Sequence, residues 1–191
     1  MKAMDFSAPE RARRIRLVLF DVDGVLTDGK LWTIPLQGEK TMEPKGFHAH
    51  DGIGISLARI GGIHTGVITK RTSETVAQRA RALRMEYVYM GQDYKIRAVR
   101  EIMQRGGFTL DQIAYVGDDV IDLPVMRVCG LAIATANARD QVKAAAHYIT
   151  PNPGGEGAGR DAIDFILQAH GTLDQCIEEY IDEHHAPAGP Q

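Results

Sequence analysis

The sequence predicts an α/β fold in which helices cover both faces of a central parallel sheet, giving a three-layer sandwich. Two observations predict it: short aliphatic runs recur along the chain, and longer segments with a helical repeat separate them. Strands that alternate with helices in this way pair in parallel through right-handed crossovers. The length of 191 residues fits one such domain, because a chain of this size can bury most of its apolar surface.

The aliphatic runs set the expected strands, and the helical repeats set the helices. The strands are expected at residues 15–20, 63–68, 86–89, 113–117 and 130–133. Helices are expected at 72–84 and 93–105, where apolar residues recur on one face. Thr109, followed three residues later by Gln112, has the spacing of a capping box and predicts a short helix before the fourth strand.

Residues 28–47 break the alternation and predict a protruding β-hairpin. The segment carries β-type residues on either side of Pro35 and Gly38 and fits no helical repeat. Its apolar residues are Trp32, Ile34 and Leu36. They could pack on their own sheet or on a neighbouring chain, and the pattern leaves both alternatives open.

The two ends of the chain differ in charge, which suggests a division into three parts. Residues 1–14 are expected to form a basic arm, 15–173 the folded domain, and 174–191 an acidic helix and tail, because no Lys or Arg follows Arg160. The charged ends are either simply solvated, or the acidic tail contacts a basic surface of another subunit.

Composition excludes several classes of partner and compartment. The net charge of −3 gives no footprint for nucleic acid, so a small-molecule partner is expected. The chain has no apolar run long enough to span a membrane and no signal-peptide core, which predicts a cytoplasmic protein. Cys129 and Cys176 lie far apart without metal-ligand or redox spacing and are expected to be reduced packing thiols.

Aspartates follow two of the expected strands, where the carboxyl ends of neighbouring parallel strands present ligand-binding groups. Asp21 and Asp23 follow the first strand, and Asp118 and Asp122 follow the strand at 113–117. If these ends lie side by side, each like-charged pair at about 5 Å costs on the order of 3 kcal/mol. The cluster must therefore protonate or bind a cation, and a set of oxygen ligands favours Mg²⁺.

Any one of these aspartates alone has a simpler explanation. A single Asp after a strand is usually a turn residue or a helix cap, and Asp119 is our candidate for that role. The combination of DVDG after one aliphatic strand and GDDVID after another is far more specific. The pair of motifs therefore predicts a metal site.

Thr69 and Lys95 lie between the two Asp motifs in the sequence. Thr69 ends the second strand, and at a helix N-terminus its hydroxyl and the backbone amides would cradle a phosphate. Lys95 lies in the first turn of a helix, where a cation is unfavourable for the helix dipole, so a position opposite the carboxylates would explain it. The simpler alternatives are a cap for Thr69 and a surface residue for Lys95.

In this order, DVDGV, Thr69, Lys95 and GDDVID resemble the four motifs of the haloacid dehalogenase superfamily of phosphatases, which have a Rossmann-like fold. Within it the chain resembles the branch without a large cap domain that contains 3-deoxy-D-manno-octulosonate 8-phosphate (KDO 8-phosphate) phosphatase. This resemblance runs from about residue 15 to 173 and includes F-x-x-x-DG-x-G, YVGDD-x-ID-x-PVM and GGEGAGRD.

The resemblance implies a chemistry for the aspartates. Asp21 would attack phosphorus and form an aspartyl phosphate, and Asp23 would protonate the leaving alcohol and then activate water. The metal ligands would be Asp21, the backbone carbonyl of Asp23 and Asp118, with Asp122 supporting them.

The remaining implied site residues contact the phosphate or the substrate. Thr69 and Lys95 would hold phosphoryl oxygens. The substrate-binding set implied by the resemblance is Thr69, Lys70, Arg71, Lys95, Asp51 and Gly52. The family closes its sites by forming homotetramers, in which the hairpin and a neighbour's C-terminal segment contribute.

The implied activity is Mg²⁺-dependent hydrolysis of KDO 8-phosphate in lipopolysaccharide precursor synthesis. Two alternatives are a nonulosonate 9-phosphate phosphatase and a non-catalytic oligomerisation module of the same fold. Three departures from the octulosonate pattern bear on this choice: Lys70 stands in place of Gly, and His50 and Glu156 in place of Arg. The GGEG form is similar to the nonulosonate enzymes. His48 and His50, two apart in an expected strand, also raise zinc binding as an alternative to packing.

Overall fold

The computed structural model describes residues 6–38 and 41–185, with side chains described as far as residue 182. Its core is a parallel six-stranded sheet, which confirms the predicted fold class. The order of the strands is β5 (Tyr87–Tyr89), β4 (His64–Ile68), β1 (Leu17–Phe20), β6 (Ile113–Gly117), β7 (Leu131–Ala134) and β8 (Tyr148–Ile149). The first strand of the chain is therefore central, with β4 and β6 on its two sides.

Alternate residues of β1 enter two separate hydrophobic layers. Val18 and Phe20 pack in one cluster, and Leu17 and Leu19 pack in the other. All four residues are buried, which is the pattern of a strand that is covered on both faces.

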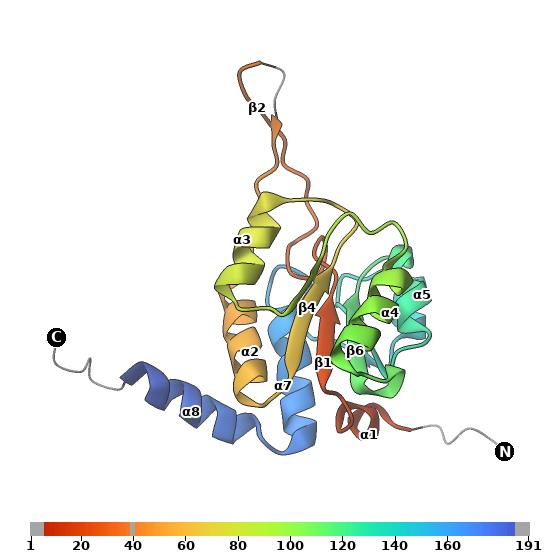
Figure 1. Cartoon of the computed structure of the whole chain (residues 1–191). Helices are drawn as coiled ribbons and strands as arrows, with labels where there is room; N and C mark the ends of the chain where they lie inside the picture. Colours follow the sequence, from red (N-terminus) through yellow and green to blue (C-terminus); the bar gives the residue numbers. More distant parts are fainter. Residues whose placement is uncertain (1–5, 39–40, 186–191) are drawn as a thin grey trace.

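Helices cover both faces of the sheet (Figure 1). One layer contains α1 (Ala8–Ala12), α2 (Ala49–Ile60), α3 (Glu74–Ala82), α7 (Ala158–His170) and α8 (Leu173–His185). The other contains α4 (Lys95–Gly106), α5 (Leu123–Met126) and α6 (Asp140–Ala145), with the short 3₁₀ turns η1 (Leu110–Gln112) and η2 (Val120–Asp122). Within the described part of the chain, no helix has both the length and the apolar character needed to cross a bilayer.

The five expected strands are confirmed to within two residues at each end. The sixth strand, β8, escaped prediction because it has only two residues. The capping box before β6 is confirmed, since Thr109 N donates to Gln112 Oε1 over 3.1 Å. Helix α3 begins two residues later than expected because Ser73, whose hydroxyl accepts from Val76 N, caps it.

The predicted hairpin is confirmed by the antiparallel pair β2 (Ile34–Pro35) and β3 (Thr41–Met42). Figure 1 shows it projecting beyond the rest of the molecule. Trp32 is 60% exposed, and the side chains of Ile34 and Leu36 are exposed too. The apolar residues therefore do not pack on their own sheet, which overturns the first of the two alternatives.

The two ends of the chain pack on the same helical layer. Ala12 in α1 is fully buried, and Cys176 in α8 is buried in the same cluster. In Figure 1, α8 extends from the body far from the hairpin. Cys129 and Cys176 are free and buried, as expected for packing thiols. Residues 1–5 and 186–191, parts of the expected arm and tail, lie outside the described residues, so the division into three parts stays a prediction.

Candidate active site

The aspartates of the two motifs meet at the carboxyl end of the sheet. Asp21 follows β1 and Asp118 follows β6, and these strands are direct neighbours with Phe20 opposite Val116. The backbone N–H of Asp21 continues the ladder by donating to Val116 O over 3.0 Å. Topology alone therefore brings together carboxylates that lie far apart in the sequence.

Three carboxylates lie close enough to hold one cation. Asp21, Asp118 and Asp122 each offer an oxygen, and these oxygens lie within 4.8 Å of one another. Asp118 Oδ1 is buried, and no group of the described protein donates a hydrogen bond to it. The set of oxygens fits a hard divalent cation such as Mg²⁺. This confirms that the two motifs converge.

Lys95 lies against two of these carboxylates. Its Nζ is 2.8 Å from Asp21 Oδ1 and 2.7 Å from Asp122 Oδ1, and all three side chains are buried. Helix α4 begins at Lys95, two residues later than expected, and Lys95 lies in its first turn as predicted. The cation lies in the first helical turn because it neutralises the carboxylates there. We call Asp21, Asp118, Asp122 and Lys95 the carboxylate centre.

Burial and crowded charge shift the pKa values in the carboxylate centre. Burial raises the pKa of Asp21 to about 6, with the charge of Asp122 adding to the effect and Lys95 opposing it. Burial and the charges of Asp21 and Asp122 raise the pKa of Asp118 to about 7. Burial alone would lower the pKa of Lys95, but Asp21 and Asp122 raise it above its usual value. The centre therefore needs more positive charge than one lysine supplies.

Asp122 orients the other members of the centre. Its Oδ1 accepts from Lys95 and from Tyr115 Oη (2.8 Å), and its Oδ2 accepts from Asp118 N (3.0 Å). Both oxygens are thus already engaged, which agrees with a supporting role. Sequence analysis did not identify Tyr115 as a site residue, because a tyrosine in an aliphatic strand is expected to be a core residue. Asp119 caps η2 by accepting from Val120 N over 2.7 Å, which confirms its predicted role.

The loop after β1 is supported from the C-terminal part of the chain. Gly24 has φ +92°, and a Cβ there would lie 2.1 Å from Asp118 Oδ2, so only glycine fits. Asn137 donates to Gly24 O over 3.2 Å and accepts from Gly154 N over 2.6 Å. The GGEG motif therefore has a local structural role, and Asn137 is a supporting residue that carries no motif in the sequence.

Asp23 has a different partner from the other three aspartates. Its carboxylate is not part of the group that could share a cation, and its partner is Lys45, which donates to Asp23 Oδ1 from the descending arm of the hairpin. The side chain of Lys45 is only 3% exposed. Sequence reasoning missed Lys45 because nothing in its local pattern separates it from other hairpin lysines.

Thr69 is buried at the end of β4, but it does not lie at a helix N-terminus as expected. Its backbone N–H donates to Tyr89 O over 2.9 Å, and its hydroxyl accepts from Arg71 N over 3.3 Å. Helix α3 begins only at Glu74, because Ser73 caps it. The prediction about the helix is wrong, since a short loop separates the strand from the helix.

A cavity of about 390 Å³ opens on these residues. It is lined by Asp21, Asp23, Gly29, Leu31, Thr69, Lys70, Arg71, Asp118, Asp119 and Ile121. Its size is in the range of small-molecule sites. The cavity brings together six predicted site residues, with the predicted nucleophile among them.

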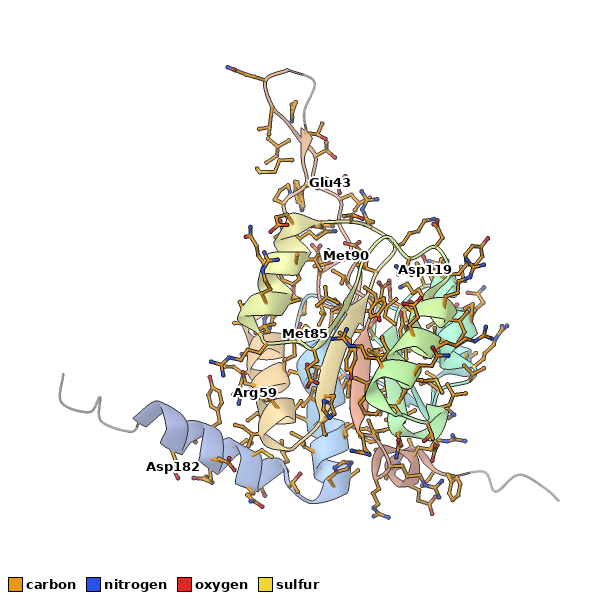
Figure 2. All side chains as sticks on the ribbon, in the orientation of Figure 1. Glu43, Arg59, Met85, Met90, Asp119 and Asp182 are labelled. Carbon is orange, nitrogen blue, oxygen red and sulfur yellow. The ribbon has the colours of Figure 1, made fainter. Side chains whose placement is uncertain are left out.

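Arg71 and Lys70 approach the cavity from the loop after Thr69. Arg71 donates through one terminal nitrogen to both carboxylate oxygens of Glu43, each over 2.8 Å. Figure 2 shows Glu43 at the root of the hairpin. Lys70 is exposed, and its Nζ lies 3.8 Å from Asp93. The hairpin is thus attached to the site by the Glu43–Arg71 pair as well as by Lys45.

The structure does not bring Asp51 and Gly52 into this cavity. Asp51 lies in the first turn of α2 and accepts from Arg160 N of α7 over 2.9 Å. A Cβ on Gly52 would lie 2.7 Å from a terminal nitrogen of Arg79. Burial raises the pKa of Asp51 to about 6, against the lowering effect of its bond from Arg160. Asp51 therefore joins two helices of one layer.

Two of the three departures from the octulosonate pattern, His50 and Glu156, also lie outside this cavity, whereas Lys70 lines it. His48 caps α2, and His50 lies within that helix, so the expectation that they share a strand is wrong. Their rings meet edge to face with centroids 4.6 Å apart. His50 and Glu156 are exposed. Among the described residues, the group able to hold a metal contains aspartates and no histidine, so zinc finds no support.

Comparison with known proteins identifies the family. Residues 71–158 match a family model described as haloacid dehalogenase-like hydrolase. The 3-deoxy-D-manno-octulosonate 8-phosphate phosphatase KdsC of Escherichia coli (strain K12) is 38% identical over 166 residues, which are 87% of this chain and 86% of that protein. The chain belongs to the haloacid dehalogenase-like hydrolases, in the branch of the KDO 8-phosphate phosphatases.

Solved structures of this hydrolase family share the whole architecture. The KDO 8-phosphate phosphatase of Yersinia pestis superposes with a TM-score of 0.83 at 38% identity, covering 87% of this chain and 88% of its own. The enzyme of Moraxella catarrhalis, solved with magnesium ion, phosphate ion and KDO, gives 0.84 at 35% identity, covering 91% and 97%. The predicted family is confirmed, and the described residues of this hydrolase form no large cap domain.

Proposed function

We propose that this hydrolase is an Mg²⁺-dependent phosphomonoesterase that converts KDO 8-phosphate to KDO and phosphate. The observation that carries the proposal is the bridge from Lys95 to Asp21 and Asp122 beside an unsatisfied Asp118 oxygen. A non-catalytic module of this fold has no need for a buried centre of this kind. Relatives along almost the entire chain are KDO 8-phosphate phosphatases, which supports the substrate.

Asp21 is the proposed nucleophile. Its Oδ1 accepts from Val22 N over 2.7 Å and from Lys95, so the carboxylate is held in one orientation at the floor of the cavity. Attack of the free oxygen on phosphorus forms an aspartyl phosphate and releases the sugar alcohol. The covalent step divides one difficult displacement into two easier ones.

Asp23 is the proposed acid and base. It lines the same cavity as Asp21 but keeps out of the cluster of three carboxylates. From this position it gives a proton to the departing alcohol oxygen and then takes one from the water that hydrolyses the aspartyl phosphate. Two carboxylates with different surroundings thus perform two different tasks.

The remaining groups of the cavity bind charge. Asp21 and Asp118, with the backbone carbonyl of Asp23, would hold Mg²⁺, which when bound neutralises charge on the transferring phosphoryl group. The Thr69 hydroxyl in the cavity lining and Lys95, which contacts Asp21, bind phosphoryl oxygens, and Lys70 and Arg71 of the lining meet the anionic substrate. Asp122 keeps Lys95 and Asp118 in place.

We further propose a homotetramer in which neighbouring subunits complete each site. The support is the projecting hairpin (Figure 1), which carries exposed apolar side chains and whose Leu31 also lines the cavity. The residues concerned are Leu31, Trp32, Ile34, Leu36 and Met42. A group of exposed apolar side chains of this size is typical of a surface that binds another protein.

The cytoplasm is the proposed compartment. Phosphate esters of sugars are made and consumed there, and both cysteines are free thiols, which suits a reducing environment. The reaction then supplies the sugar acid for lipopolysaccharide precursor synthesis, as the family resemblance implies.

A nonulosonate 9-phosphate remains the second candidate substrate. It is favoured by His50 and Glu156, which stand where octulosonate enzymes have arginine, and by Lys70, which adds a cation at the mouth of the cavity. Because His50 and Glu156 are exposed in one subunit, they act on specificity only if a neighbour brings them to a site.

Phosphate release from KDO 8-phosphate, a nonulosonate 9-phosphate and an aryl phosphate, each with Mg²⁺ and with EDTA, tests the proposal. The expected result is Mg²⁺-dependent release with the highest kcat/KM for KDO 8-phosphate. A preference for the nonulosonate would replace the substrate, and a chain inactive on all three would leave only the oligomerisation module.

A further inference from the structure

We infer that Lys45 is a positioning residue that holds the carboxylate of Asp23 in the orientation needed for acid and base catalysis. The inference rests on the proposed function, because it assigns a task to a contact of the proposed acid. It concerns a residue of the hairpin that no motif of the sequence marks.

The burial of Lys45 is the first observation. Its side chain is 3% exposed although the neighbouring residues Met42 and Gly46 are exposed. An ammonium group leaves water at a high free-energy cost unless an anion pairs with it. Lys45 meets this condition by donating to Asp23 Oδ1.

The position of Asp23 is the second observation. Asp21, Asp118 and Asp122 bring their oxygens within 4.8 Å of one another, but Asp23 does not join them although it is only two residues from Asp21. A fourth carboxylate in the cluster would add repulsion or become a further metal ligand, and a carboxylate that binds metal cannot also transfer the proton. Lys45 attracts Asp23 in another direction and so keeps it available.

The competing cation is occupied elsewhere. Arg71 lines the same cavity as Asp23, but it donates to both oxygens of Glu43 over 2.8 Å. Glu43 and Lys45 lie on either side of Pro44 and bind different residues. Glu43 pairs with Arg71, and Lys45 pairs with Asp23. The root of the hairpin therefore fixes two functional side chains at once.

Steady-state kinetics of Lys45→Met, Lys45→Arg and Lys30→Met test the inference. Lys30 lies on the other arm of the hairpin, is exposed and pairs with Asp28, so it is a matched control for the loss of one hairpin lysine. For KDO 8-phosphate we expect Lys45→Met to lower kcat by about 10²-fold with KM little changed, as for loss of an acid or base. Lys45→Arg should recover part of the loss, and Lys30→Met should equal the wild type.

A good leaving group separates orientation of Asp23 from binding of phosphate. Nitrophenolate leaves without a proton, so Lys45→Met should still release a burst of nitrophenolate equal to the enzyme concentration from p-nitrophenyl phosphate. The later steady rate, which needs the base, should fall. A slowed burst with a raised KM would mean that Lys45 binds phosphate, and full activity of Lys45→Met would mean that it has no part in catalysis; either result overturns the inference.

A double-mutant cycle keeps the test valid if Lys45→Met folds poorly. Asp23→Asn combined with Lys45→Met removes both charges of the pair, so no unpaired buried cation or anion remains. If Lys45 acts through Asp23, the double variant should lose no more kcat than Asp23→Asn alone, and additive losses would overturn the inference.

The same measurements distinguish failure of the proposed function from failure of this inference. A wild type that hydrolyses only the aryl phosphate would end the sugar-acid proposal, while the burst and the cycle on that substrate would still decide the role of Lys45. A wild type inactive on every phosphate ester would overturn both.

Discussion

The carboxylate centre and the hairpin are close together in the molecule but differ in how their side chains are satisfied. In the centre, Lys95 and Asp122 are buried and form an ion pair with each other, with Lys95 at the start of α4. In the hairpin, Trp32 and its apolar neighbours are exposed and lie in or next to a pair of two-residue strands. The comparison teaches that the groups of the carboxylate centre are satisfied within one protomer, whereas the apolar side chains of the hairpin are not covered by it.

The two regions are nevertheless joined at one place. Glu43 and Lys45, at the root of the hairpin, pair with Arg71 and Asp23 at the cavity. Figure 2 shows Glu43 and Asp119 toward the same end of the molecule, with Arg59 and Asp182 toward the other. The hairpin therefore contacts the proposed acid directly.

The largest expected effect is on the centre. Asp21→Asn should lower turnover by about 10⁴-fold or more, because an amide cannot attack phosphorus. Its Oδ1 can still accept from Val22 N, so circular dichroism should show a folded protein. Phosphate release and a thermal melt of the same preparation check this, and sustained wild-type turnover would mean that another group is the nucleophile.

Removal of the positive charge of Lys95 should lower both the stability and the activity of the protein. Lys95→Met leaves Asp21 and Asp122 buried without a counter-charge, so the free energy of unfolding should fall by about 3–5 kcal/mol. The matched variant Tyr115→Phe removes one neutral hydrogen bond to Asp122 and should cost only about 1 kcal/mol. Urea unfolding measures both, and equal losses would show that the charge of Lys95 adds nothing to stability.

Asp51 tests whether a charge away from the cavity is structural. Its pKa is raised by burial from 3.8 to about 6, so the folded state binds more protons than the unfolded state between these values. Stability should therefore fall as pH rises from about 4 to 6 and then level off. Asp51→Asn keeps an oxygen for Arg160 N and has no such loss, so at pH 7.5 it should be more stable than the wild type by on the order of 1–2 kcal/mol.

Urea unfolding of the wild type and Asp51→Asn at pH 4 and pH 7.5 measures this difference. The difference between the two proteins should be much smaller at pH 4, where the carboxyl is protonated in the folded state and only about half ionised in the unfolded state. Destabilisation of Asp51→Asn at every pH would contradict the structural interpretation. A raised KM of this variant would contradict it too, because it would show that Asp51 binds substrate as first predicted.

The smallest effect on the folded protomer should come from the hairpin. Deletion of residues 30–40 leaves Glu43 and Lys45 in place and removes side chains that are mostly exposed, so the stability of a single protomer should change by less than about 1 kcal/mol. The mass in solution should instead fall from tetramer to a smaller species. Light scattering that gives an unchanged tetramer would refute the assembly role of the hairpin.

Much of the centre could be predicted because topology leaves little choice. Asp21 and Asp118 follow strands that parallel pairing places side by side, and Lys95 opens the helix that starts beside them. The strand ends and the helix start are predicted by the sequence pattern and by the four motifs, whereas the adjacency of β1 and β6 is shown only by the structure. The hairpin too is predicted by the sequence pattern, because its turn residues interrupt every helical repeat.

Other features could not be predicted because they depend on contacts between distant segments. Lys45 and Asn137 meet the loop after β1 from other parts of the chain, and nothing in their own neighbourhood marks them. Thr69 was placed at a helix start because the sequence does not reveal that Ser73 caps α3 four residues later. Asp51 sits in a motif, but only packing shows that it faces α7 and not the cavity.

The place of β1 has a consequence for how the chain is made. This strand leaves the ribosome first, yet both of its sheet partners, β4 and β6, are synthesised later. Until then LVLF is an unpaired, wholly apolar segment, the type of sequence that associates with other nascent chains. We therefore expect the growing chain to be most prone to association before β4 and β6 are made.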